Sequence, residues 1–288
     1  IAKESLYAVV ESTFDKIDVI KGVSFIRDVA CDLGIPAVIN VSASSDIGPH
    51  DGGSLFEAVL AGFVDKNCAV VLSAGNNGQE RRHVEFSRTD LGGGGIDIPF
   101  TIDAGMDDRE IEVSMDFWCD GENAFDVTLL SPDGREFAET GSGEGHVFAL
   151  GGVQVFACNN VSGPPNGHSN ILLVIKGSGL SAEQNGEWTV RIASSDQSDF
   201  TCCGWLASIP DGAAWFSGYV SERTTVSSPS TAKHVISIGA YFERDGRIIP
   251  LSLGPTRDGR AKPDLYAKSP HGSSQAAAAV TGLSLIHI

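Results

Sequence analysis

The chain has 288 residues, 42% of them hydrophobic, and a mean hydropathy of +0.02, which is the composition of a globular rather than a disordered protein. Its formal net charge is −17, which argues against nucleic acid or an anionic membrane surface as a partner, because binding phosphate requires clustered Lys and Arg. The sequence contains no run of about 18 apolar residues and therefore predicts no transmembrane segment.

The first part of the chain shows helix and strand patterns in alternation. Apolar residues recur at helical spacing within residues 19–33, and Gly34 is a natural helix end. A short apolar run at residues 37–41 predicts a buried strand. Ser54, followed three residues later by Glu57, predicts a capping box that opens a second helix.

A second apolar run at residues 69–73 completes a strand-helix-strand unit with parallel strands. In parallel sheets of this kind, ligands bind beyond the carboxyl ends of the strands. The sequence therefore predicts a binding crevice at the two strand ends, formed by Ser42, Ala43, Ser44, Ser73, Ala74 and Gly75.

The pattern changes to period-two alternation from about residue 80 to residue 207. Turn sequences such as SPDG at residues 131–134 separate the apolar runs, which favours an antiparallel β-sandwich. The clearest strands are predicted at residues 111–117, 126–130, 153–157, 171–175 and 188–192. A buried-strand pattern returns at residues 235–240. We therefore expect one domain formed by residues 1–79 and 208–288, with residues 80–207 as an inserted sandwich.

Three further segments carry chemistry. Residues 73–78 read SAGNNG and place the carboxamide of Asn76 just after a strand. Residues 272–282 read GSSQAAAAVTG and place Ser274 at the start of an alanine-rich helix. The hydroxyl there is exposed, and the backbone N–H has no partner within the helix, so it can donate to a developing oxyanion. The third segment is GPTRDGRAKPDL at residues 254–265.

Together with VINVS at residues 38–42, these segments resemble, in the same order, the motifs of subtilisin-like serine peptidases. The resemblance implies an α/β fold with a doubly wound, mostly parallel sheet. It also implies that Ser274 is the nucleophile and Asn76 the oxyanion donor of an endopeptidase that acts through an acyl-enzyme. Residues 126–134 resemble jelly-roll modules found in some members, so we expect the insertion to be jelly-roll-like.

The same resemblance implies a polypeptide substrate and an extracellular or cell-envelope location. Calcium is the one cofactor that it suggests, although no residues of this sequence form a recognisable ligand set. The six cysteines lack metal-ligand spacing, so no metal site is predicted from them. Cys31 is expected to be a small buried hydrophobe, and disulfides among the four cysteines of the middle third are left open.

A nucleophilic serine needs a general base, and that base needs an orienting carboxylate. The Asp and His motifs of the family do not occur in this sequence, and residues 1–6 resemble the stretch that follows the family's histidine helix. We therefore expect a fragment that is inactive without its base. Among the seven histidines, His50 is the first alternative base because Asp51 is adjacent to it, whereas His271 reads as a loop residue.

Two other functions compete with peptidase activity. A non-catalytic relative could bind a partner through its sandwich, which is favoured by Gln275 and Ala279 in place of the methionine and histidine common in the family. An unrelated α/β protein with a carbohydrate-binding sandwich would make the shared segments a coincidence. A complete gene lacking the histidine motif would decide for the non-catalytic relative.

Overall fold

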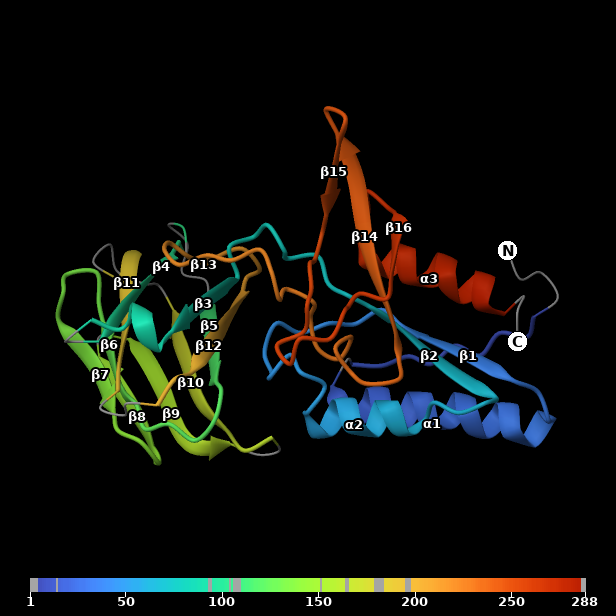
Figure 1. Ribbon diagram of the computed structural model, residues 1–288, viewed down its shortest axis with the longest axis horizontal. Helices are drawn as coiled ribbons and strands as arrows, with labels where there is room; N and C mark the ends of the chain where they lie inside the picture. The colour runs from blue at the N-terminus through green and yellow to red at the C-terminus, as the bar shows by residue number, and fades with distance from the viewer. Residues whose placement is uncertain are drawn as a thin grey trace. The chain divides into compact units, whose positions relative to one another are not determined.

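The computed structural model describes residues 5–13, 15–92, 95–103, 105, 110–150, 152–163, 166–178, 184–194 and 198–285. The chain divides into two compact units (Figure 1). The first unit consists of residues 1–79 and 223–288, and the second consists of residues 80–222. Residues 1–4, part of the stretch that suggested a truncated start, and His287 lie outside the described residues.

The first unit contains one five-stranded sheet. Its strands are β1 (Ala37–Val41), β2 (Cys68–Ser73), β14 (Ile236–Arg244), β15 (Arg247–Pro250) and β16 (Leu265–Lys268). β1 pairs with β2, β2 with β14, and β14 with β16, all in parallel, whereas β14 and β15 form an antiparallel pair. The sheet is therefore mixed.

Helices lie on both faces of this sheet (Figure 1). Helices α1 (Lys16–Leu33) and α2 (Leu55–Gly62) share a buried cluster with Val70 and Leu72 of β2. Helix α3 (Ser273–Ser284) packs through Ala276 and Ala277 against Val71 of the same strand. Successive side chains of a strand point to opposite faces of the sheet, so Val71 lies on the face opposite to that of Val70 and Leu72.

Two helix ends in the first unit, the end of α1 and the start of α2, are those that the sequence predicts. Gly34 ends α1 with a φ of 67°, a left-handed conformation that glycine adopts without strain. Ser54 caps α2, and its hydroxyl accepts a hydrogen bond from the Glu57 N–H at 3.2 Å. The Glu57 carboxylate in turn accepts from the Ser54 N–H at 3.2 Å, which completes the capping box. Both predictions are confirmed.

Replacing Ser54 by alanine is expected to destabilise the protein by about 1 kcal/mol, because the Glu57 N–H loses its acceptor. Ser54→Gly should cost only a few tenths of a kcal/mol, because a glycine at the N-cap leaves the helix end more open to water. The midpoint of urea unfolding measures both changes. Equal losses for the two variants would contradict a capping role for this hydroxyl.

The second unit contains two antiparallel sheets. The six-stranded sheet has the order β3-β12-β5-β10-β9-β8, and the five-stranded sheet has the order β13-β4-β11-β6-β7. The strands are β3 (His83–Ser87), β4 (Ile96–Ile102), β5 (Glu110–Cys119), β6 (Asp126–Leu130), β7 (Glu136–Thr140), β8 (Glu144–Leu150), β9 (Val153–Gly163), β10 (His168–Ser178), β11 (Gly186–Ala193), β12 (Thr201–Ile209) and β13 (Ala214–Phe216).

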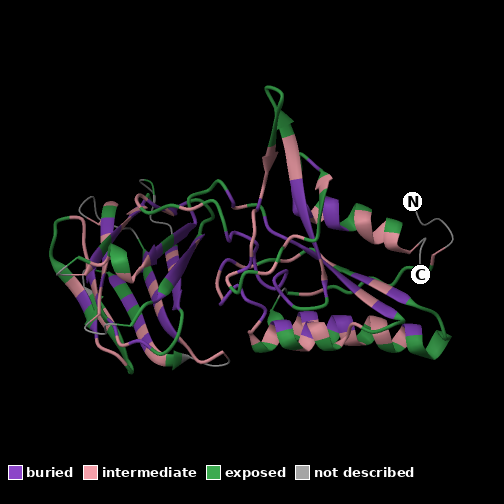
Figure 2. Cartoon of the chain, in the orientation of Figure 1, coloured by how far each residue is buried: buried purple, intermediate pink, exposed green. Residues whose placement is uncertain are grey.

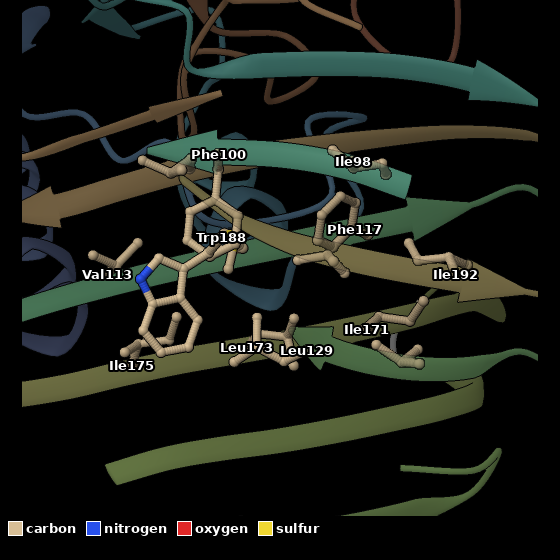
Figure 3. Close-up of a cluster of buried hydrophobic side chains, with 14 of the residues drawn as sticks. Ile98, Phe100, Val113, Phe117, Leu129, Ile171, Leu173, Ile175, Trp188 and Ile192 are labelled. Carbon is tan, nitrogen blue, oxygen red and sulfur yellow. The ribbon is translucent and has the colours of Figure 1, made fainter. Parts of the chain in front are cut away.

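One hydrophobic core joins the two sheets of the second unit. Figure 2 shows buried residues along the strands of both sheets, and Figure 3 shows the side chains between them. Trp188 of β11 is completely buried there, and its indole N–H donates to the Gln184 carbonyl at 2.8 Å. Its ring lies 6.4 Å from that of Phe100 and 5.5 Å from that of Phe137, measured between centroids.

The predicted fold class, an α/β protein built on a doubly wound, mostly parallel sheet, is wrong for this chain. Strands account for 43% of the described residues and helices for 16%, so the protein is mostly β. The physical reason lies in residues 80–222, whose period-two pattern buries one face of each strand and satisfies the backbone in antiparallel ladders. Among the described residues, helices cover only the five-stranded sheet of the first unit, and the two sheets of the second unit pack against each other.

The jelly-roll expectation is not supported either. Strands β8, β9 and β10 pair consecutively within one sheet, whereas a jelly roll is built from two Greek keys. The predicted boundary at residue 207 falls inside β12, and β13 still pairs with β4 of the same unit. The second unit therefore continues to residue 222.

Three of the six cysteines bear on the sequence predictions. Cys119 and Cys202 face each other across β5 and β12 and form a disulfide. Cys31 is exposed, so the prediction that it is buried is wrong. The buried face of α1 passes through Val23 and Ala30, and the residue after Ala30 is turned about 100° away from that face.

Candidate functional site

The start of helix α3 lies against the loop that follows β2. Gly272, the N-cap of the helix, has a φ of 107°, and a Cβ atom added there would lie 3.0 Å from the Asn76 Oδ1 atom and 3.1 Å from its Nδ2 atom. Glycine is therefore required at this position for two reasons, which are its positive φ and the close approach of the Asn76 amide. The predicted nucleophile and oxyanion segments are brought together.

Hydrogen bonds join the two segments directly. The Ser273 N–H donates to Asn76 Oδ1 at 2.8 Å, and the Gly75 N–H donates to Ser273 Oγ at 3.1 Å. Because a backbone N–H can bond only to the amide oxygen, the first contact fixes which way the Asn76 amide is turned. Its NH₂ group is left to donate to something else. Ser273, which is 1% exposed and makes both contacts, was not among the residues predicted for the site.

Ser274 is the second residue of α3, so its N–H belongs to the first turn, where no partner within the helix exists. The side chain is half-buried. Within the described parts of the chain, its hydroxyl makes no hydrogen bond. The Ser42 hydroxyl donates to the Ser274 carbonyl at 3.4 Å, which places the end of β1 beside the helix start.

The six predicted substrate-binding residues differ in accessibility. Ser42 and Ser44 are exposed and Ala43 is half-buried, so the end of β1 can be reached by a ligand. Ser73, Ala74 and Gly75 are buried. The Ala74 N–H donates to the Ile238 carbonyl at 2.9 Å, and the Ala74 carbonyl accepts from the Ser227 N–H at 2.9 Å. These three residues hold the loop in place, and their role toward a substrate stays a prediction.

The loop after β2 is also held from its buried side. The Asn77 amide donates to Asp46 Oδ2 at 2.6 Å, and the Gly78 N–H donates to the Leu251 carbonyl at 2.7 Å. A Cβ atom on Gly75 would lie 2.1 Å from Ser227 Oγ, so that glycine cannot be replaced without displacing Ser227. Nothing in the sequence singled out Asp46 or Ser227, because neither belongs to a recognisable motif.

His50 is not placed to act as the general base. Its side chain is completely buried, with Nδ1 2.7 Å from the Val226 carbonyl and Nε2 3.0 Å from the Asp46 carbonyl. Both ring nitrogens are therefore engaged by main-chain oxygens. His234 and His271, the other described histidines of the first unit, are exposed, and no hydrogen bond links either of them to Ser274 among the described residues.

The segment at residues 254–265 braces the loop that carries Asp46 and His50. Arg257 forms a buried ion pair with Asp51, and its Nε donates to the Pro49 carbonyl at 2.8 Å. The pKa of Asp258 is lowered overall. Burial alone would raise that pKa, but hydrogen bonds from Arg260 and Thr256 and the Arg260 charge outweigh burial. No hydrogen bond joins this segment to Ser274 or Asn76 among the described residues.

The residues that the structure describes contain no cluster of three or more His, Cys, Asp or Glu side chains able to hold a metal ion. No described helix combines the length and apolar character that crossing a membrane demands. The calcium prediction gains no ligand set from these residues.

Comparisons with known proteins give a likeness to a solved protease structure. No protein-family model matches the chain, and no curated protein matches it. Among solved structures, the chain is similar to the Clostridium perfringens CspB protease, with a TM-score of 0.80 and 22% sequence identity. The match covers 99% of this chain and 60% of that chain, so this chain spans less than two thirds of the solved one. At this identity the likeness shows a shared fold.

The predicted membership of the subtilisin-like serine peptidases is wrong on these findings. No family model supports it, and the mostly β architecture differs from the α/β architecture that membership implies. The segments that carried the resemblance are strand ends, turns and a helix start, which define local geometry and not the arrangement of a whole chain. The chain has the fold of the solved protease structure and is assigned to no family.

Proposed function

We propose that this chain carries the nucleophile and the oxyanion-binding part of a serine endopeptidase site. Ser274 is the nucleophile, and the Asn76 amide and the Ser274 N–H are the oxyanion donors. One observation carries the proposal: the bond from the Ser273 N–H to Asn76 Oδ1 at 2.8 Å leaves the amide NH₂ as a preorganised donor beside the helix start. The fold shared with a protein named as a protease supports it.

In the proposed reaction, Ser274 Oγ attacks the carbonyl carbon of a peptide bond and gives its proton to a general base. The oxygen of the tetrahedral intermediate becomes negative and accepts hydrogen bonds from Asn76 and from the Ser274 N–H. The C–N bond then breaks, the protonated amine leaves, and water hydrolyses the acyl-enzyme. The exposed end of β1 at Ser42–Ser44 is the surface on which we expect the polypeptide to lie.

The general base is the part of the site for which the described residues offer no candidate. Both His50 ring nitrogens are engaged, and His234 and His271 make no hydrogen bond to Ser274 within the described ranges. We propose that the base is supplied by another polypeptide segment. The 288-residue chain should then acylate slowly by itself, and a small diffusible base should accelerate it.

Fluorophosphonate labelling of the purified chain, with and without imidazole, tests this proposal. We expect slow labelling without imidazole, faster labelling as imidazole is added, and no labelling of Ser274→Ala. Ser284→Ala, which removes a hydroxyl from the other end of α3, is the matched control and should label as the unaltered chain does. Labelling that persists in Ser274→Ala would refute the assignment of the nucleophile.

A second candidate function is a non-catalytic binding module. It is favoured by two exposed apolar side chains on the second unit, Val147 and Phe156, which are 71% and 40% exposed and lie opposite each other on β8 and β9. Contiguous exposed apolar surface marks interaction sites in other proteins, and cross-strand neighbours such as these form contiguous surface. Failure of imidazole to promote labelling at any concentration would favour this module over the peptidase.

A further inference from the structure

Asp46 is a buried carboxylate that the proposed chemistry does not use. It is 8% exposed, and it lies in the loop that follows β1. Its Oδ1 accepts a hydrogen bond from the Ser227 hydroxyl at 3.1 Å, and its Oδ2 accepts from the Asn77 amide at 2.6 Å. A buried carboxylate is costly to desolvate and is usually held by such donors, so these contacts account for its presence.

Asn77 connects the Asp46 carboxylate to the segment that carries the proposed oxyanion donor. Asn77 directly follows Asn76, and the next residue, Gly78, is fixed by a 2.7 Å hydrogen bond to the Leu251 carbonyl. Asn76 itself is exposed, and the bond to Ser273 holds only its side-chain oxygen. The main chain that carries Asn76 is therefore held on its far side by the contact between Asn77 and Asp46.

Asp46 is itself fixed by its surroundings. Its main-chain carbonyl lies 3.0 Å from Nε2 of the buried His50 ring, and the other ring nitrogen lies 2.7 Å from the Val226 carbonyl. The adjacent residue, Ser45, pairs with Ser228 through two main-chain hydrogen bonds of 2.8 and 3.0 Å. The carboxylate thus projects from a rigid support, as a group that orients another must.

We propose that Asp46 is a positioning residue for the oxyanion donor. Through Asn77 it fixes the backbone at Asn76, so that the Asn76 amide stays turned toward the carbonyl attacked by Ser274. This inference rests on the proposed function. It assigns to Asp46 no contact with the substrate and no proton transfer.

Imidazole-assisted fluorophosphonate labelling of the full chain measures the effect. Asp46→Ala should slow labelling by about tenfold to a hundredfold, because a displacement of about 1 Å at a reacting group has effects of that size. Asp46→Asn should slow it less, because the amide oxygen still accepts from Asn77 while its NH₂ donates to the Ser227 hydroxyl. Asn77→Ala removes the same tether without emptying a buried site, and should resemble Asp46→Ala.

A double-mutant comparison separates positioning from general destabilisation. If Asp46 acts through Asn76, Asp46→Ala should have little further effect once Asn76→Ala is present. Equal slowing in both backgrounds, or unchanged labelling in both Asp46→Ala and Asn77→Ala, would overturn the inference. The side-chain amide signals of Asn76 in ¹H–¹⁵N spectra should shift in both single variants, and unshifted signals would also count against it.

Failure of this inference can be told apart from failure of the proposed function. If Ser274→Ala still labels, the proposed function has failed. If Ser274→Ala does not label and Asn76→Ala labels slowly, but Asp46→Ala and Asn77→Ala label normally, only the role of Asp46 is lost. Far-ultraviolet circular dichroism of each variant shows whether the fold is retained, and Asn77→Ala decides the question if Asp46→Ala does not fold.

Discussion

Replacing Asn76 by alanine is expected to slow imidazole-assisted acylation of Ser274 by about 10²- to 10³-fold, or about 2.7–4 kcal/mol in the barrier. The substitution removes the side-chain donor to the oxyanion and leaves the Ser274 N–H in place. It also removes the acceptor of the Ser273 N–H. The rate constant for fluorophosphonate labelling, followed by intact-protein mass spectrometry, measures the loss.

Asn76→Asp separates the donor from the acceptor role of this side chain. A carboxylate still accepts from the Ser273 N–H, so the helix start should keep its place, but it cannot donate to an oxyanion and repels the developing charge. We expect a loss at least as large as that of Asn76→Ala. Asn67→Ala, at an exposed asparagine of the same unit, is the matched control. Near-normal labelling of Asn76→Asp would exclude this amide as an oxyanion donor.

Replacing Trp188 by alanine should destabilise the second unit by about 3–5 kcal/mol, the range found for large aromatic residues removed from protein cores. Trp188 is completely buried, and it lies among the side chains that fill the space between the two sheets (Figure 3). The loss combines the transfer of an apolar ring to water with a cavity that the rigid sheets cannot close. Urea unfolding followed by circular dichroism gives the free energy.

Two companion variants make the Trp188 result specific. Trp188→Phe keeps most of the ring but gives up the hydrogen bond to Gln184, and should fall between the alanine variant and the unaltered chain. Val147→Ala alters a residue of the same unit that is 71% exposed, and should change the stability by less than about 0.5 kcal/mol. A loss below 1 kcal/mol for Trp188→Ala would show that the two sheets do not share a tight core.

Local structure was predictable where neighbouring residues determine it. The strand at residues 37–41 and the strand at residues 126–130 have the predicted bounds, and the capping box at Ser54 is present. The three-residue strand β13 was missed, because a period of two cannot be recognised over so short a run. The fold class was misjudged because it was set by the strand-helix-strand pattern of residues 37–73, whereas most of the strands lie in the segment for which a sandwich was predicted.

The candidate site, like the fold, could be predicted only in part from the sequence. Asn76 and Ser274 stand in segments whose residue types suggest their chemistry, and the structure brings these segments into contact. The roles of Asp46 and Ser227 could not be predicted from the sequence, because these residues lie 181 positions apart and interact only through their side chains. A carboxylate in a polar loop resembles any solvated acid until its burial is known.

The division of the chain at residues 80 and 222 has a consequence for engineering. Val84 of β3 forms a β-bridge with Val220, and the Ser221 N–H donates to the His83 carbonyl at 2.9 Å, so the two ends of this segment lie side by side. A module whose two ends emerge side by side can be excised, or transplanted into a surface loop of a different host, without stretching the chain on either side. Residues 80–222 should therefore be removable as a unit. A short glycine-rich linker in their place should allow the remaining sequence to be produced as a continuous polypeptide.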